Sequence, residues 1–194
     1  MNQYEFWHLI ETAQMESESS EAFADRLTEM MIAVSAEEIL DFYEHLSDLC
    51  SSAYRCDLWG AAALIYEGYC GDDPFLYFRL WLVAQGKAVY GSALASPDSL
   101  AEHRPIQVMA AKPMSDWDEG SEWPWLESLL YVAPNAYEHK TGMTFDDAID
   151  ARRPDVLRSV SEGDPVGEAW DLSNREEIQR RAPRLAALFL HKVK

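Results

Sequence analysis

Two adjacent carboxylates and an arginine stand close together in the segment best equipped for chemistry. Asp72 and Asp73 precede Pro74, and Arg79 follows within an apolar run. Adjacent carboxylates can bind a cation or share a proton, so the three charged residues predict a pocket at the start of a helix over 74–85. In the structural alternative, Asp73 caps that helix, and Arg79 either pairs with an acid or extends its charged end to solvent.

The helix that must position Arg79 is crowded with aromatic side chains. Tyr77 or Trp81 would form a wall of the predicted pocket. An arginine in such surroundings needs a counter-ion or a route to water, because an unpaired charge is costly to bury. Asp57 and Glu67 are candidate partners for Arg79 in the structural alternative, so the pocket and the internal salt bridge both stay open.

A second candidate site lies in the segment 117–125. Trp117, Asp118, Glu119 and Trp123 combine large aromatic side chains with carboxylates. Aromatic faces beside carboxylates can hold a cation or a basic side chain of a partner. Tryptophans can equally fold back over the core as a lid, and the sequence leaves both interpretations open.

No complete catalytic, metal or nucleotide motif stands in the chain. The cysteines at 50, 56 and 70 lack the C-x2-C spacing of a zinc site, and no two histidines are spaced H-x3-H. His45 and Cys50 could form a nucleophile pair, although a buried histidine beside an inert buried cysteine is the commoner arrangement. The sequence therefore predicts no cofactor and no metal, and it favours a non-enzymatic role while leaving catalysis open.

The balance of charge is strongly acidic. The 34 Asp and Glu residues outnumber the 16 Lys and Arg residues, which gives a formal net charge of −18. Such a charge repels phosphate backbones and anionic membranes, so neither nucleic acid nor a membrane is a predicted partner. It attracts a basic protein, although acidity can also serve solubility alone. The last 23 residues are locally basic, and we expect them to lie against acidic surface of the same molecule or of a neighbour.

Helical periodicity runs through most of the chain, and in no segment do apolar and polar residues alternate regularly enough to predict a strand. We expect an all-α fold: a single compact bundle of about seven to nine helices with a proline-rich central loop region over 96–121. A short strand over 105–109 is the one alternative. The predicted division is a helical domain over 1–142 and a C-terminal helical extension over 143–194 packed on it. The first residues lack the pattern of a secretory signal, which predicts a cytoplasmic protein.

Several short motifs resemble a known family. They are Phe6-Trp7, Leu9-Ile10, Ser35 through Phe42, Tyr54, Asp57 through Ala62, Asp72-Asp73-x-Phe75, Phe78-Arg79-x-Trp81-Leu82, Gly86, Pro97 through Ala101, and Glu127 through Thr141. Over about residues 1–142 the chain resembles the bacterial domain-of-unknown-function family numbered 4240. The resemblance implies a helical domain with a shared pocket and supplies no reaction. Where the family usually has a glycine and a serine before the two acids, this chain has Tyr69-Cys70-Gly71, so that turn can differ.

Two functions follow from these observations as hypotheses. The first is an acidic cytosolic interaction protein, similar to an immunity protein or an inhibitor, that binds a basic protein partner; a nucleic-acid mimic is a variant of it. The alternative is an enzyme or small-ligand-binding protein that uses the Asp-Asp…Arg pocket at the start of the helix over 74–85.

Overall fold

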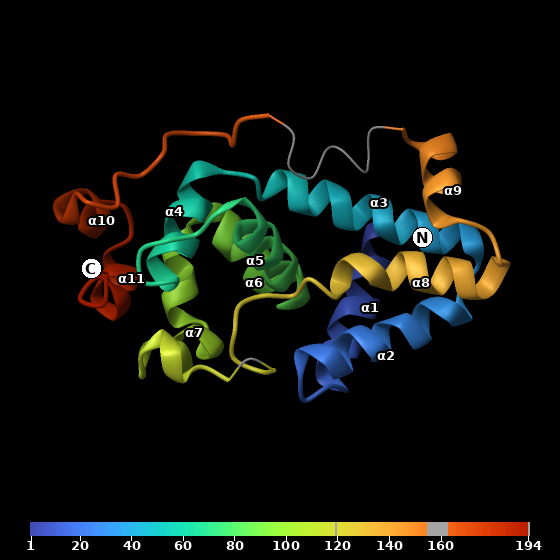
Figure 1. The fold of residues 1–194 in the computed structure, drawn as a ribbon, viewed down its shortest axis with the longest axis horizontal. Helices are drawn as coiled ribbons and strands as arrows, with labels where there is room; N and C mark the ends of the chain where they lie inside the picture. The colour runs from blue at the N-terminus through green and yellow to red at the C-terminus, as the bar shows by residue number, and fades with distance from the viewer. Residues whose placement is uncertain (119, 155–162, 194) are drawn as a thin grey trace.

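The computed structural model describes residues 1–118, 120–154 and 163–193, and the regular elements among these residues are helices, joined by turns and loops (Figure 1). The α-helices are α1 (Gln3–Met15), α2 (Ser20–Ala33), α3 (Ala36–Ser52), α4 (Cys56–Ile65), α5 (Asp72–Ala84), α6 (Lys87–Ala95), α7 (Arg104–Ala110), α8 (Leu129–Thr141), α9 (Phe145–Arg152), α10 (Arg175–Arg181) and α11 (Pro183–Phe189). Two short 3-10 helices, η1 (Pro97–Glu102) and η2 (Met114–Asp116), complete the set. The predicted all-α class is confirmed. The helices of the described residues are more numerous than predicted.

Local hydrogen bonds at the helix starts explain where several helices begin. Asn2 and Glu5 form a reciprocal capping box at α1, and Ser35 and Glu38 form another at α3. In each box the two residues stand three positions apart, so the pattern can be recognised in the sequence. Gly142, with a φ of 68°, ends α8 in the left-handed conformation that glycine adopts without steric cost. These boundaries depend only on neighbours a few residues apart.

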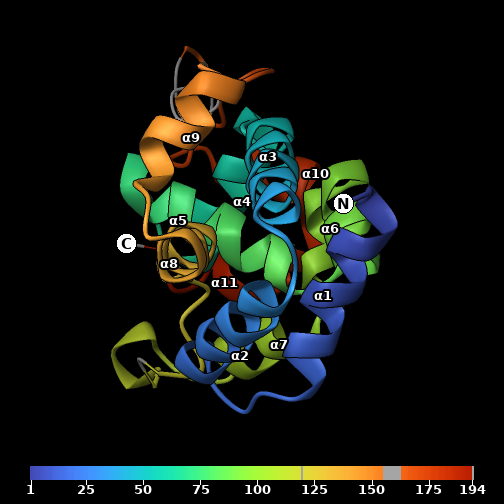
Figure 2. The ribbon, with the colours of Figure 1, turned by 90° about the vertical axis from the view of Figure 1, so that its right-hand side faces the viewer.

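The helices form two groups on either side of α5. α1, α2, α3 and α8 pack together on one side, whereas α4, η1, α7 and α11 pack together on the other (Figures 1 and 2). Helix α5 contacts α1, α3, α4 and α6, so it lies where the groups meet. Fully buried phenylalanines from both groups and from α5 fill the interior: Phe6, Phe42, Phe75, Phe78 and Phe189. Among the helices that the structure describes, none is long and apolar enough to cross a bilayer.

The proline-rich segment is more ordered than the predicted loop. Pro97 starts η1 and Pro105 lies in the first turn of α7, positions where the missing N–H of proline breaks no helical bond. The strand considered over 105–109 is therefore wrong, because those residues belong to α7.

A proline also lies inside a helix of the structure. Helix α8 begins at Leu129 and continues through Pro134. Close packing of α8 on α2 and α3 holds it across the proline.

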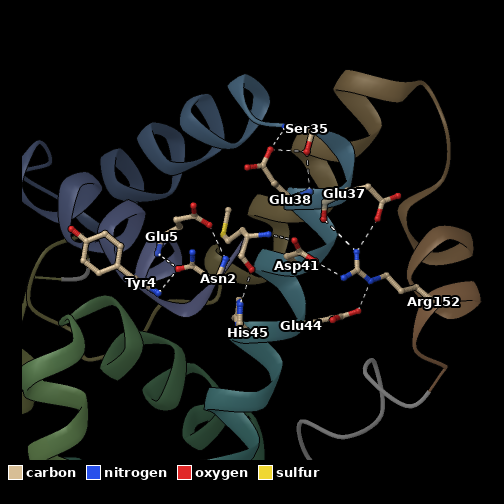
Figure 3. A network of polar contacts seen from close by, with 11 residues as sticks. Asn2, Tyr4, Glu5, Ser35, Glu37, Glu38, Asp41, Glu44, His45 and Arg152 are labelled. Atoms are coloured by element: carbon tan, nitrogen blue, oxygen red, sulfur yellow. Dashed lines mark hydrogen bonds and ion pairs between the residues drawn. The ribbon is translucent and has the colours of Figure 1, made fainter.

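The residues after α8 divide between the two ends of the molecule. Helix α9 lies beside α8 and α3, whereas α10 and α11 lie at the far end near α4 and η1 (Figure 1). Arg152 ties α9 to α3 through ion pairs with Glu37, Asp41 and Glu44, and the amino group of Met1 also contacts Asp41 (Figure 3). A patch of exposed and half-buried carboxylates on α3 is thus neutralised by an arginine more than 100 residues away.

The basic end of the chain lies against acidic groups of the same molecule. Asp98, in η1, is buried and accepts hydrogen bonds from the backbone N–H groups of Arg184 and Leu185, both at 2.9 Å. Its second oxygen accepts from Nε of Arg184, also at 2.9 Å. Arg184 pairs with Glu102 as well, and Lys192 lies 3.8 Å from Glu67. Asp98 therefore caps α11 from a different part of the chain.

Candidate functional site

The three charged residues of α5, Asp72, Asp73 and Arg79, do not point in the same direction. The side chain of Arg79 points into the core and is only 1% exposed. Its Nη1 donates a hydrogen bond of 2.8 Å to the carbonyl oxygen of Cys50, and its guanidinium carbon lies 4.7 Å from the ring centroid of Tyr54 and 5.0 Å from that of Phe75. Burial lowers the pKa of the guanidinium. Arg79 thus joins α3 and α5 inside the protein.

Asp72 and Asp73 lie on the outside. Both are exposed in the first turn of α5, where the positive end of the helix dipole favours acids. Neither is among the described contacts of Arg79, which lies two helical turns further along α5. The predicted capping role is wrong as well, because Gly71 is the N-cap residue. The helix places its acids at the surface and its arginine in the core, so the three do not line one pocket.

The partners considered for Arg79 are engaged elsewhere. Asp57 accepts two hydrogen bonds from the guanidinium of Arg55, at 3.0 and 2.7 Å. Glu67 accepts the backbone N–H of Met114 at 2.9 Å. Neither acid is among the described ion-pair partners of Arg79. The described contacts of Arg79 include a carbonyl oxygen and two aromatic faces.

The exposed acids of α5 adjoin a group of aromatic side chains, which we call the Tyr77 surface (Asp73, Tyr77, Trp125, Glu127 and Tyr131). The rings of Tyr77 and Trp125 lie 4.6 Å apart, and Tyr131, 51% exposed, donates to Glu127 at 3.3 Å. Partial burial, followed by the hydrogen bond to Glu127, raises the pKa of Tyr77, and the nearby charge of Asp73 acts in the same direction. Two pairs spaced four residues apart in the sequence, 73 with 77 and 127 with 131, could have revealed this surface.

Trp81 does not belong to the Tyr77 surface. It is buried, and its ring lies 5.9 Å from that of His103, whose Nε2 is 2.9 Å from Oε1 of Gln85. Burial lowers the pKa of His103, which favours the neutral imidazole. Trp81 and Gln85 help to line a cavity of about 210 Å³ between α1, α5 and α7, together with Phe23. Trp81 therefore does not form a wall beside Asp72 and Asp73.

Two tryptophans of the segment 117–125, Trp117 and Trp123, fold back on the core. Trp117 is buried, donates from Nε1 to the carbonyl oxygen of Met109 at 3.0 Å, and meets Trp123 edge to face at 5.4 Å. Asp118 is exposed, and a hydrogen bond from the Ser121 hydroxyl is the main cause that lowers its pKa. Glu119 lies outside the described residues. This geometry matches the lid interpretation for Trp117 and Trp123.

His45 and Cys50 do not form a nucleophilic pair. The Nε2 atom of His45 lies 3.1 Å from the carbonyl oxygen of Met1. Burial raises the pKa of Cys50 to about 12, so its thiol stays protonated near neutral pH. In the part of the chain that the structure describes, no three His, Cys, Asp or Glu side chains gather in a group able to hold a metal ion.

A second pocket, which sequence reasoning missed, lies over α4. We call it the α4 pocket, and its volume is about 330 Å³. One side comes from α4 and the loop before α5, and the other comes from the segment 165–172; the residues used below are Cys56, Trp59, Ala63, Tyr69, Cys70 and Trp170. The segment 165–172 is tied to the turn before α4 through two backbone hydrogen bonds of Val166, with Cys56 and Tyr54, at 2.9 and 3.1 Å. More than 90 residues separate its two sides, so no local pattern predicts it.

Gly60 allows this segment to approach α4. A Cβ atom at position 60 would lie 2.3 Å from Cδ2 of Trp170, too close for any real contact. We expect Gly60→Ala to lower the free energy of unfolding by about 1–2 kcal/mol, because the overlap with a rigid ring outweighs the helix propensity of alanine. Urea denaturation measures the change.

Gly91, on α6, provides the matched control, since a Cβ atom there meets nothing within 4 Å. Gly91→Ala is expected to raise the free energy of unfolding by about 0.5–1 kcal/mol. A stabilising effect of Gly60→Ala would contradict the packing of Trp170 on α4.

Of the comparisons with known proteins, the one with family models finds a match, and it covers the chain from α1 into α8. The family model of a protein of unknown function, DUF4240, matches residues 1–139 of the 194-residue chain. No curated protein and no solved structure matches the chain. The match ends within α8, so the segment 165–172, which covers α4, lies outside it. Since most of its length fits the family model, this chain belongs to the DUF4240 family.

Proposed function

We propose that this protein is an acidic cytosolic interaction protein, of the immunity or inhibitor type, that binds a basic protein partner through the Tyr77 surface. The observation that carries the proposal is the joint exposure of carboxylates and aromatic faces on that surface. No ion pair in the described residues involves Asp72, Asp73 or Glu127. A lysine or arginine of a partner would find both a carboxylate and an aromatic face there.

The distribution of internal ion pairs supports this choice of surface. Arg152 neutralises carboxylates of α3, Arg184 neutralises those of η1, and Lys112 pairs with Glu122 at 2.6 Å. Much of the positive charge of the chain is therefore used within the fold. The net charge of −18 would accelerate the approach of a basic partner, and the Tyr77 surface offers the contacts that hold it.

Neutralising two acids of this surface is expected to weaken binding. In Asp73→Asn/Glu127→Gln, the loss of two attractive charges should raise Kd about tenfold. The partner is first captured from the native host with the intact chain, then purified, and Kd is measured by calorimetry. For the intact chain, raising the salt concentration to about 0.5 M should weaken the complex, since salt screens charge pairs.

The control removes the same charge from another face. Glu21→Gln/Asp25→Asn alters two exposed acids of α2 and should raise Kd by less than about threefold, through long-range attraction alone. Equal effects of the two double variants would reject the Tyr77 surface as the binding site. Binding that does not respond to salt would reject the basic partner.

A further inference from the structure

The segment 165–172, which we call the α4 strap, lies over α4 without entering the core. It forms no helix and continues toward α10 (Figure 1). Pro165, Trp170 and Leu172 are half-buried, and the other residues of the strap are exposed. Segments that bury so little apolar surface are the ones that open locally in native proteins. The strap is therefore a candidate for motion that is independent of the helices.

The contacts that attach the α4 strap are individually weak. Val166 makes two backbone hydrogen bonds at the start of α4, at 2.9 and 3.1 Å, but its side chain is 73% exposed. Sγ of Cys56 donates to the carbonyl oxygen of Pro165 at 3.5 Å, and a thiol is a weak donor. Glu168 pairs with Arg181, yet its side chain is 82% exposed, and ion pairs at such positions contribute little. Local opening has to break these contacts and one aromatic contact.

That aromatic contact carries a cost while the strap is closed. Trp170 packs over Gly60, and its buried Nε1 has no hydrogen-bond partner among the described residues. A buried donor without an acceptor costs free energy, whereas opening returns this N–H to water. The strap also leaves the α4 pocket of about 330 Å³ between itself and the helix, so the contact is not close-packed. The other pocket walls are Trp59, Ala63, Tyr69 and Cys70.

The helices on either side of the strap in the sequence are held more firmly. Phe145 and Ile149 anchor α9 and are buried, and Ile178 of α10 is buried as well. The buried carboxylate of Asp98 holds the start of α11 through two backbone N–H groups. Apolar burial is the main favourable term in folding, so these anchors resist opening. The strap can therefore leave α4 while both neighbouring helices stay folded.

We propose that the α4 strap is a cover that opens and closes over α4 while the helices stay folded, and that it controls access to the α4 pocket. In the open state the indole N–H of Trp170 is hydrated, and Trp59 and the thiols of Cys56 and Cys70 can be reached from solvent. The strap lies beyond the family match, so this control belongs to the C-terminal part of the chain. It does not rest on the function proposed for the Tyr77 surface.

Opening is measured by labelling the thiols of the full chain with N-ethylmaleimide, with peptide mass spectrometry giving the rate at each cysteine. Cys56 contacts the strap, whereas Cys50 is 1% exposed in the core and reacts through global unfolding. Across urea concentrations below the unfolding transition, the Cys50 rate should rise steeply. The Cys56 rate should stay within about twofold, because opening of the strap exposes little surface.

Two matched pairs of variants disturb the strap from both sides. Val166→Pro removes a backbone N–H of the strap and should raise the Cys56 rate about tenfold, whereas Val166→Ala keeps that N–H and should stay within about twofold. Gly60→Ala pushes the indole away from α4 and should also raise the rate about tenfold. Gly91→Ala, on α6, should leave the rate unchanged.

The proposal is overturned if the Cys56 rate rises with urea as steeply as the Cys50 rate, since the strap then opens only with the whole protein. Equal Cys56 rates in Val166→Pro and Val166→Ala would overturn it too, because the thiol would then react without any opening of the strap.

Discussion

Arg79→Ala is expected to lower the free energy of unfolding by about 4 kcal/mol. The side chain is the largest among those that are fully buried, so its removal opens a cavity between α3 and α5. It also leaves the carbonyl oxygen of Cys50 without its 2.8 Å donor and removes the cation from the faces of Tyr54 and Phe75. Guanidinium chloride denaturation of the purified chain measures the loss.

Two further variants separate the causes. Arg79→Met keeps most of the volume and removes the charge, so it should cost about 2 kcal/mol, half the effect of alanine. Arg104→Ala, at an exposed position on α7, should change stability by less than about 0.5 kcal/mol. If Arg79→Ala costs less than about 1 kcal/mol, Arg79 is not a structural residue and a role of its charge in function regains weight.

Asp98→Ala is expected to cost about 3 kcal/mol and to release the last two helices from the body of the protein. The buried carboxylate is the acceptor for two backbone N–H groups at the start of α11 and for Nε of Arg184. Alanine leaves these donors unsatisfied in a site that is only 6% exposed. Limited proteolysis after α9 should become faster, and denaturation gives the loss of stability.

Asp98→Asn tests the role of the individual oxygens. The two backbone bonds share Oδ1, whereas Nε of Arg184 bonds Oδ2. An asparagine can keep the first two bonds and lose only the third, so we expect about half the cost of alanine. Glu102→Gln removes only an exposed contact of Arg184 and should cost less than about 1 kcal/mol. Equal, small effects of all three variants would contradict a capping role for Asp98.

The pair of variants at Asp98 bears on how the chain is organised. The family match ends in α8, and α11 packs on η1 and α4, both within the matched part. If one carboxylate holds α11 in place, the α4 pocket also depends on it, because the segment 165–172 leads directly to α10. The division into a domain over 1–142 and an extension over 143–194 remains a prediction that the same proteolysis would test.

Features that rest on neighbours within one helical turn could be predicted from the sequence. The capping boxes at Asn2 and Ser35, the glycine end of α8 at Gly142 and the break before Pro183 all involve contacts between residues at most four apart. Such contacts form whatever the rest of the chain does, so residue type and spacing are sufficient evidence. The helical class follows from the same local rules.

The candidate site could be predicted only in part, because the positions of its side chains depend on contacts with residues far away in the sequence. The spacing of Asp72 and Arg79 puts both on one face of a helix. The start of that face is exposed to solvent, whereas two turns later it is buried, because Arg79 packs against Cys50 and Tyr54. From the sequence, the Trp117 side chain could have faced a partner or the core. Its hydrogen bond to the carbonyl oxygen of Met109 holds it against the core.

The amino-acid sequence by itself determined that this chain is acidic and helical, and where several of its helices start and stop, because charge and helix capping are properties of single residues and near neighbours. The tertiary structure alone decided that Arg79 is buried and that Trp170 closes a pocket over α4. Both outcomes need contacts between segments far apart in the chain, and the free energy of those contacts depends on which surfaces are brought together, which no local pattern encodes.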